Sequence, residues 1–385
     1  MIAKVLMVTT SPFIVTHHLR EHLKALAQNY EVTLAVNTSE PYPLRLEGID
    51  CVLMPVNIER RIAPVSDFRA LFFLWRRMRT KRYALVHSVA PKAGLLAMVA
   101  AWLARVPVRV HTFQGEVWAT RRGVMRQILK AADRLTAHLA TCVLVVGNGE
   151  RQFLIDEGIL QSRKSTVLAN GSIAGIDFNR FRPDSTSRAI VRAGLKIDEQ
   201  ATVLLFLGRI ARDKGILDLA RVFHNVAAGR PNLHLVIAGP DEENMQQEII
   251  LVASTAQNRI HFAGLVQNPS EWLAAADLLC LPSYREGFPN VVLEAAATGI
   301  PCLGSRIYGM RDAITDGVTG LMHEPANLSD LETKLTELVD DPIGRKSLGQ
   351  AALSRVRRDF DCDQVVAAMV ELYGGLICGE NQHRV

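Results

Sequence analysis

Short apolar runs alternate with longer amphipathic stretches along most of the chain. In its first half, runs rich in Val, Leu and Ile predict seven strands, at residues 4–8, 32–36, 51–54, 85–87, 108–112, 142–146 and 166–169. The alternation then resumes and predicts six more strands, at residues 203–207, 233–237, 260–263, 278–281, 301–303 and 320–323. Strands separated by helical stretches are typical of parallel sheets covered by helices. The pattern therefore predicts an α/β protein built from two doubly wound halves.

The length of the chain agrees with two domains, because 385 residues exceed the size at which one core keeps growing. The interruption of the pattern places a hinge near residues 178–200. We assign residues 1–180 to a first domain, 181–360 to a second, and 361–385 to a closing segment with a helix over 363–377.

Several signals bear on where the protein works. No run of about 18 apolar residues occurs, so no membrane-spanning segment is predicted. The first ten residues have the pattern of a strand rather than of a signal peptide. The six cysteines are scattered and lack Cys-x-x-Cys spacing, which favours reduced thiols and a cytoplasmic location.

The most informative stretch is residues 278–305, where an apolar strand leads into a polar loop and then a helix starting at about Pro289. Pro suits the first helical position, because its missing N–H has no partner there anyway. Glu286 lies in the loop before the helix, and Glu294 lies inside it, roughly 7–8 Å along the axis. Two carboxylates thus flank free backbone N–H groups, which suits a ligand with hydroxyls at both ends and phosphate between them. A nucleotide sugar is such a ligand, whereas two solvated helix carboxylates would be the ordinary explanation of this spacing.

A second motif follows the strand at 203–207. That strand ends at Gly208, and Arg209 and Lys214 bracket a short turn before Gly215 opens an amphipathic helix. Cations at the carboxyl end of a parallel strand lie where open α/β sheets bind ligands, and both side chains suit phosphate oxygens. Arg212 is expected to be a surface charge, since charged residues are mostly exposed.

These two motifs resemble those of the retaining glycosyltransferases of family four. The resemblance implies the GT-B fold, in which two Rossmann-like doubly wound domains face each other across a cleft and the last helix crosses back to the first domain. It implies that Glu286 contacts the donor sugar, that Glu294 holds the ribose, and that Arg209 and Lys214 bind the diphosphate. Residues 111–180 look closest to members that build bacterial surface polysaccharides, such as capsule and lipopolysaccharide.

By the same resemblance, the donor site of a nucleotide-diphosphate sugar can be assigned residue by residue. Its catalytic members are Glu286, Arg209 and Lys214, and the donor-binding set is Gly208, Arg209, Lys214, Gly239, Val266, Glu286, Gly287, Phe288, Asn290 and Glu294. No second carboxylate is marked as a nucleophile. The expected reaction is therefore a front-side transfer in which cations stabilise the leaving diphosphate.

The acceptor side is expected in the first domain. Candidates after the strand at 108–112 are Gln114, Glu116 and Trp118, and weaker ones are His17, His18 and Lys92. Many relatives carry a His where this sequence has Gln114. Two further differences are Ser11-Pro-Phe in place of a first-loop Gly-Gly, and Gly239-Pro-Asp, which lacks a second glycine.

Charge is distributed unevenly. Residues 1–180 hold 24 Lys and Arg against 13 Asp and Glu, a net charge of +11, whereas the whole chain has +5. Basic residues cluster at 68–82 beside Phe72, Phe73 and Trp75, and again at 121–130. Such helices either lie on anionic lipid or are core helices with a solvated basic edge. The family resemblance favours a glycan or polyprenyl-diphosphate-linked acceptor, reached by peripheral contact with the inner face of the membrane.

Other chemistries have less support. Asp359-Phe-Asp resembles a cation-binding element, but it precedes a helix, where Asp363 is expected to act as a cap. We therefore expect no metal and no other cofactor. No nucleic-acid-binding module is present, so no nucleic acid partner is expected. Two rival functions remain, a nucleotide-sugar epimerase of the same fold and a non-catalytic sugar-binding protein; incubation with nucleotide sugars alone would identify the epimerase.

Overall fold

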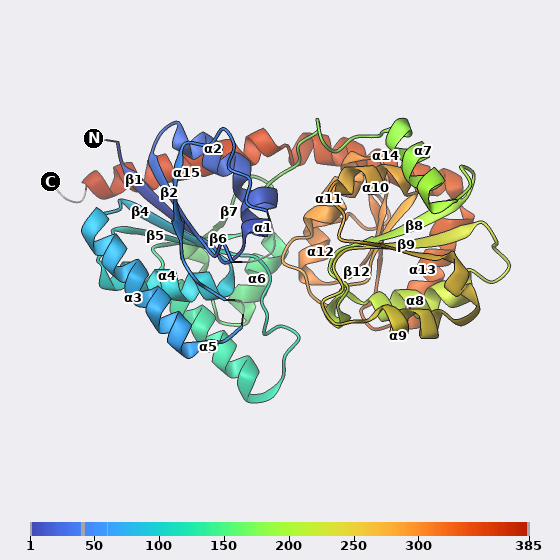
Figure 1. The fold of residues 1–385 in the computed structure, drawn as a ribbon, viewed down its shortest axis with the longest axis horizontal. Helices are drawn as coiled ribbons and strands as arrows, with labels where there is room; N and C mark the ends of the chain where they lie inside the picture. Colours follow the sequence, from blue (N-terminus) through green and yellow to red (C-terminus); the bar gives the residue numbers. More distant parts are fainter. Residues whose placement is uncertain (1, 40–42, 60, 383–385) are drawn as a thin grey trace. The chain divides into compact units, whose positions relative to one another are not determined.

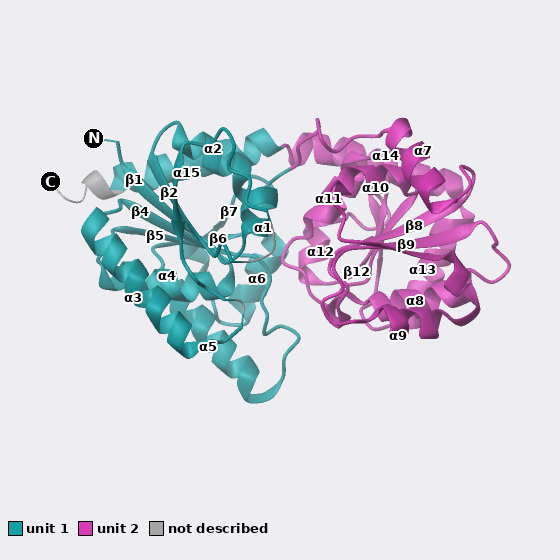
Figure 2. Ribbon diagram, viewed as in Figure 1, with its two compact units in different colours: residues 1–175, 362–385 teal, residues 176–361 magenta. Residues whose placement is uncertain are grey.

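The computed structural model describes residues 2–39, 43–59 and 61–382 and contains two compact α/β units (Figures 1 and 2). Unit 1 is Met1–Gly175 with Cys362–Val385, and unit 2 is Ile176–Asp361. The division therefore lies after Gly175, just before the hinge range of 178–200, and the α-helix Ser185–Leu195 within that range belongs to unit 2. The closing helix belongs to unit 1.

Unit 1 is built on a seven-stranded parallel sheet in the order β3-β2-β1-β4-β5-β6-β7. Its middle strands are buried on both faces and mostly apolar, as expected for a parallel sheet covered by helices, although β4 also buries His87 and Ser88. All seven predicted strands are present, with ends shifted by at most a few residues. The strands are β1 Lys4–Val8, β2 Glu31–Val36, β3 Cys51–Pro55, β4 Leu85–Val89, β5 Val108–Phe113, β6 Cys142–Val145 and β7 Ser165–Val167.

The helices of unit 1 connect these strands. They are α1 Pro12–Ile14, the π-helix Val15–Leu19, α2 Arg20–Ala27, α3 Pro64–Lys81, α4 Pro91–Leu103, α5 Gly123–Leu139, α6 Asn148–Asp156 and α15 Cys362–Gln382, with a 3-10 turn at Ser162–Lys164. Helices α3, α4 and α5 lie side by side on one face of the sheet (Figure 1).

Unit 2 repeats the architecture with a six-stranded parallel sheet in the order β10-β9-β8-β11-β12-β13. The order reverses between β8 and β11, which creates a switch point of the kind at which doubly wound sheets bind ligands. All six predicted strands are present. They are β8 Thr202–Leu207, β9 Leu233–Ala238, β10 Ile260–Gly264, β11 Leu278–Leu281, β12 Cys302–Ser305 and β13 Gly320–His323.

The helices of unit 2 cover both faces of its sheet. They are α7 Ser185–Leu195, α8 Ile216–Val226, α9 Gln246–Ala253, α10 Pro269–Ala275, α11 Asn290–Ala297, α12 Tyr308–Ala313, α13 Leu328–Asp340 and α14 Pro342–Asp359, with 3-10 turns at Arg212–Lys214 and Ser254–Arg259. Buried Phe206 of β8 and Phe223 of α8 lie in a core that extends across the whole unit.

Helix α15 packs on α2 and closes unit 1. Val365, Met369 and Tyr373 are buried along one face, and the Tyr373 hydroxyl lies 2.6 Å from His87 Nδ1 on β4. Among the described residues, α15 is also the one helix that is long and apolar enough to cross a membrane by length and composition. It begins at Cys362, so Asp363 lies in the first helical turn and not at the expected capping position.

Candidate functional site

The candidate site in unit 2 is formed by loops at the carboxyl ends of its strands, where two backbone segments approach closely. Gly239, after β9, has φ +143°, and a Cβ added there would lie 1.8 Å from the carbonyl oxygen of Gly208, after β8. Gly239 N also donates to the carbonyl oxygen of Gly264 at 2.7 Å. Only glycine fits at 239, so the structure requires the single glycine that the sequence retains there.

Lys214 and Glu286 meet at the centre of this site. Lys214 Nζ donates to Glu286 Oε1 at 2.7 Å, and the side chains are 15% and 12% exposed. Gly215, with φ +68°, lets the β8 loop pass against β11, because a Cβ there would lie 2.0 Å from the carbonyl oxygen of Pro282. The structure thus brings together a cation and a carboxylate that the sequence assigned to two separate motifs. The pair leaves each group accessible at one side while offsetting the cost of desolvating it.

Arg209 lies on the same loop as Lys214 and is bound by carboxylates. Its guanidinium donates to Glu242 at 2.7 Å and lies 3.7 Å from Asp213. Burial alone would lower the pKa of Arg209, but Glu242, Asp213 and Glu286 outweigh it and raise the pKa, so the side chain stays charged. Arg212 instead pairs with Glu248 and is 62% exposed, which agrees with its prediction as a surface charge.

Asp213 and Arg285, two residues that the sequence analysis did not assign to the site, hold these loops together. The Arg285 side chain donates to the Asp213 carboxylate at 2.8 Å, and the backbone N–H of Tyr284 donates to the carbonyl oxygen of Asp213 at 2.9 Å. Burial would raise the pKa of Asp213, but Arg285, Lys214 and Arg209 together lower it, so this carboxylate is ionised. Each missed residue is adjacent in sequence to an assigned one. The signal was the alternation of opposite charges in two loops that a parallel sheet brings to one edge.

Glu294 lies on α11 behind the loop. The helix begins at Asn290, and Pro289 is its N-cap rather than the first helical residue, because Pro289 keeps an extended conformation with ψ 95°. Glu294 is therefore the fifth helical residue. Burial raises the pKa of Glu294 to about 7, and Arg180 only partly offsets this. The carboxyl group is thus poised to exchange a proton near neutral pH or to accept hydroxyl hydrogen bonds.

The remaining donor-side candidates line the same edge of the sheet. Gly287 and Phe288 lie in the loop before α11, and the Phe288 ring packs 5.7 Å from Phe360. A Cβ on Gly309 at the start of α12 would lie 2.3 Å from the carbonyl oxygen of Glu286, so α12 fixes the path of this loop. Val266 follows β10 and packs against the core of the unit, and Asn290 opens α11.

The acceptor-side candidates after β5 divide by burial. Glu116 and Trp118 are each 1% exposed, whereas Gln114 is half-buried. Trp118 Nε1 donates to Asp133 at 2.7 Å and its ring stacks on Phe153. These contacts make Trp118 part of the core of unit 1, so it does not offer its ring to an acceptor. Gln114 remains the accessible member of the three.

The Gln114 turn is held by a glutamate of α6. Gly115 has φ +86°, and its N–H donates to Glu150, which also accepts from Val146 N at 3.3 Å. This buried carboxylate ties the β5 loop to the β6 loop. Glu150 is a positioning residue that the sequence reasoning did not single out.

His17, His18 and Lys92 lie at the same carboxyl edge of the unit 1 sheet. His17 and His18 belong to the π-helix Val15–Leu19, and burial, with His17, lowers the pKa of His18 to about 4. Lys92, in the first turn of α4, pairs with Asp67 of α3 at 2.6 Å and donates to the carbonyl oxygen of Arg61. Lys92 therefore links the starts of α3 and α4.

The structure shows no preformed cation site in the part of the chain it describes: nowhere do three His, Cys, Asp or Glu side chains group closely enough to hold a metal ion. Within Asp359-Phe-Asp, Asp359 is bound by Arg358 at 2.7 Å and lies 3.9 Å from Arg355.

Comparison with known families matches both units. The family described as "Glycosyl transferases group 1" matches residues 187–355, within unit 2. The family described as "Glycosyl transferase 4-like domain" matches residues 14–171, within unit 1.

Individual relatives and structures agree with these matches. The chain is 26% identical over 319 residues to a capsular polysaccharide biosynthesis glycosyltransferase of Staphylococcus aureus, covering 83% of each chain. It is 25% identical over 322 residues to a UDP-Gal:alpha-D-GlcNAc-diphosphoundecaprenol alpha-1,3-galactosyltransferase of Escherichia coli, covering 82% of each. Its fold is similar to that of sucrose-phosphate synthase from Thermosynechococcus elongatus, with a TM-score of 0.80, 20% identity and coverage of 98% and 100%.

Proposed function

This chain belongs to the GT-B glycosyltransferases, and on that premise we propose that it transfers a sugar, with retention of configuration, from a nucleotide-diphosphate sugar to a glycan carried on a polyprenyl diphosphate. The Lys214–Glu286 pair at the carboxyl edge of the unit 2 sheet carries the proposal. It supports the proposal because a cation that could bind the diphosphate lies beside a carboxylate that could bind the donor sugar. A sugar-binding protein without catalysis would not need that combination.

The chemistry follows from the charges at the site. When the bond between the sugar C1 and the diphosphate oxygen breaks, negative charge grows on the diphosphate and positive charge on the sugar ring. Lys214 and Arg209 stabilise the negative charge on the diphosphate, and Glu286 stabilises the positive charge on the sugar ring. The acceptor oxygen then bonds to C1 on the face that the diphosphate leaves, and the departing phosphate oxygen takes the acceptor proton. Glu294 would hold the ribose hydroxyls from α11.

The biological setting is proposed from the relatives. One of them is named for capsular polysaccharide biosynthesis, and another for a substrate carried on diphosphoundecaprenol. A role in bacterial surface polysaccharide synthesis fits both names. The sugar that we propose is a hexose or an N-acetylhexosamine.

Nucleotide binding tests the donor site. Lys214→Ala and Arg209→Ala should each weaken the binding of nucleotide diphosphates about ten- to hundredfold, because a hydrogen bond to a charged group contributes about 1.5–3 kcal/mol. Arg212→Ala is the matched control, since Arg212 lies on the same loop but pairs outward with Glu248. Unchanged affinity in both variants by calorimetry would reject the assignment. Conversion of a nucleotide sugar without any acceptor would instead point to an epimerase.

We also propose that unit 1 contacts the membrane through α3. The inner face of this helix packs Ala70, Leu74 and Met78 into the core. Its outer face exposes Phe68 and Phe72, which are 69% and 51% exposed, among several basic side chains. The helix is therefore both a core helix and an amphipathic surface of the kind that binds anionic lipid.

The membrane proposal has its own test. Replacing five exposed basic residues with Gln should reduce co-sedimentation with anionic liposomes and flatten its salt dependence, since each contributes about 1 kcal/mol near the surface. Those five are Arg76, Arg77, Arg79, Lys81 and Arg82. Nucleotide affinity should not change. Equal sedimentation of variant and wild type at low salt would remove the membrane contact and leave the transferase intact.

A further inference from the structure

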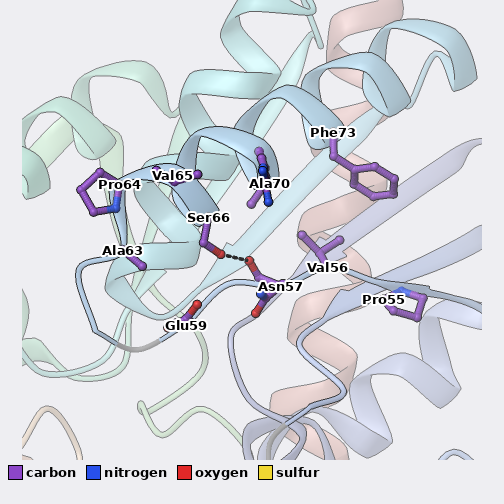
Figure 3. Close-up of a pocket in the computed structure, with 11 residues that line it drawn as sticks. Pro55, Val56, Asn57, Glu59, Ala63, Pro64, Val65, Ser66, Ala70 and Phe73 are labelled. Carbon is purple, nitrogen blue, oxygen red and sulfur yellow. Dashed lines mark hydrogen bonds between the residues drawn. The ribbon is translucent and has the colours of Figure 1, made fainter.

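A hollow of about 680 Å³ opens in unit 1, between the end of β3 and the first turns of α3 (Figure 3). This volume lies within the roughly 300–1,000 Å³ of ligand pockets. Val56 and Ala70, each 5% exposed, and the half-buried Phe73 form apolar walls. The Ser66 hydroxyl in the wall already donates to the carbonyl oxygen of Asn57 at 3.4 Å. The hollow therefore suits an apolar occupant rather than a polar one.

The place of the hollow connects it to the acceptor side. It begins where β3 ends, at the carboxyl edge of the sheet that also carries the Gln114 turn. Lys92, an acceptor-side candidate, pairs with Asp67 in the first turn of α3. Ser66, next to Asp67, lines the hollow. The hollow is thus adjacent to the α3 turn that binds Lys92, whereas the Gln114 turn follows β5, the fourth strand from β3 in the sheet.

Charge and exposure at its rim indicate the kind of ligand. The Arg69 side chain lines the hollow and makes no ion pair with any described residue, although the carboxylate of Glu59 also lies on the wall. Val65, which also lines the hollow, is 68% exposed. An apolar hollow that is lined by the Arg69 side chain and by the exposed Val65 of α3 complements an alkyl chain that ends in a phosphate.

We propose that this hollow holds the chain segment next to the diphosphate of a polyprenyl-diphosphate acceptor, with Arg69 facing the phosphate. The inference rests on the proposed function and deepens it, because it assigns the lipid part of the acceptor to residues of unit 1.

Geranylgeranyl diphosphate, kept below its micelle concentration, serves as the probe, with inorganic pyrophosphate as the chain-free reference. Wild type should bind the isoprenoid at least about tenfold more tightly than pyrophosphate, since burying alkyl carbon adds affinity. Ser66→Leu and Ala70→Leu fill the hollow from two positions and should each abolish that preference. Thr80→Leu makes the same kind of change near the other end of α3, outside the hollow, and should keep it.

Each outcome has a separate meaning. Equal affinity for the two ligands in wild type, or retained preference in folded Ser66→Leu and Ala70→Leu, would overturn the inference. If the filled variants bind the isoprenoid normally but lose sedimentation with phospholipid vesicles, the hollow takes membrane acyl chains and the acceptor assignment is wrong. Nucleotide diphosphate affinity, measured on the same samples, reports on the donor site alone, so failure of the proposed function remains distinguishable.

Discussion

Replacing Glu294 with Gln should change how the stability of unit 2 depends on pH. Burial raises the pKa of Glu294 from its ordinary 4.5 to about 7. As pH rises, this carboxyl loses its proton at a lower pH in the unfolded chain than in the folded protein. Between these pH values the folded state therefore binds more protons than the unfolded state. Stability therefore falls as pH rises from about 4.5 to 7, and the whole penalty is present above pH 7. Gln carries no ionisable proton, and Glu294→Gln should escape this fall.

The size of the effect follows from the difference between the two pKa values. At about 1.4 kcal/mol per pKa unit, the ionised carboxylate costs the folded state about 3 kcal/mol above pH 7. In a domain of this size, 1 kcal/mol shifts the Tm by about 2–4 °C. The Tm of Glu294→Gln relative to wild type should therefore rise by several degrees between pH 5 and pH 8.

Thermal melting without nucleotide, at closely spaced pH values, measures this difference. Glu337→Gln is the control, because Glu337 lies in the same unit with a side chain that is 54% exposed and pairs with Lys334. Its Tm difference from wild type should stay nearly constant with pH. If the Tm difference between Glu294→Gln and wild type also stays constant with pH, the carboxyl group of Glu294 is not desolvated, contrary to the structure.

Three further outcomes are expected. If the proposed mechanism is right, transfer should continue in excess EDTA, because Arg209, Lys214 and the start of α11 would supply the positive charge at the diphosphate. Complete loss of transfer that Mg²⁺ restores would refute this. Asp213→Ala and Arg285→Ala should each lower kcat/KM for the donor, and the double variant should lose little more than either single variant. The coupling free energy between the two residues should be about 0.5–3 kcal/mol. Additive losses would show that the pair does not act as a unit. Trp118→Phe should cost about 1–3 kcal/mol of stability, because Asp133 loses its buried donor, and nucleotide affinity should be unchanged; a drop in that affinity would contradict a structural role for Trp118.

The sequence predicted the strands of both sheets because each is an apolar run between polar turns, and a parallel sheet buries such runs on both faces. It also predicted the Lys214 and Glu286 motifs separately. It did not predict that the two side chains would touch, or that Arg285 would hold Asp213. Those contacts join residues about seventy positions apart, and local pattern carries no information on such distances.

Tertiary packing and backbone conformation explain the other differences. Trp118 was an acceptor-side candidate, but α5 supplies Asp133 and α6 supplies Phe153, and these two contacts place its ring in the core of unit 1. Pro289 was expected to be the first residue of α11, but its extended backbone conformation, with ψ 95°, makes it the N-cap, and the helix begins one residue later at Asn290. The hollow beside α3 had no signal in the sequence, because its walls come from β3 and α3 and its shape depends on their packing.

The return of α15 to unit 1 has a consequence for synthesis on the ribosome. Unit 2 is continuous in sequence, whereas unit 1 needs a helix made after all of unit 2. Until that helix emerges, His87 lacks its Tyr373 partner, and the surface of α2 that later receives α15 stays uncovered. The nascent chain should therefore complete unit 2 before unit 1, and an incomplete product that lacks α15 should expose an apolar face to chaperones and proteases.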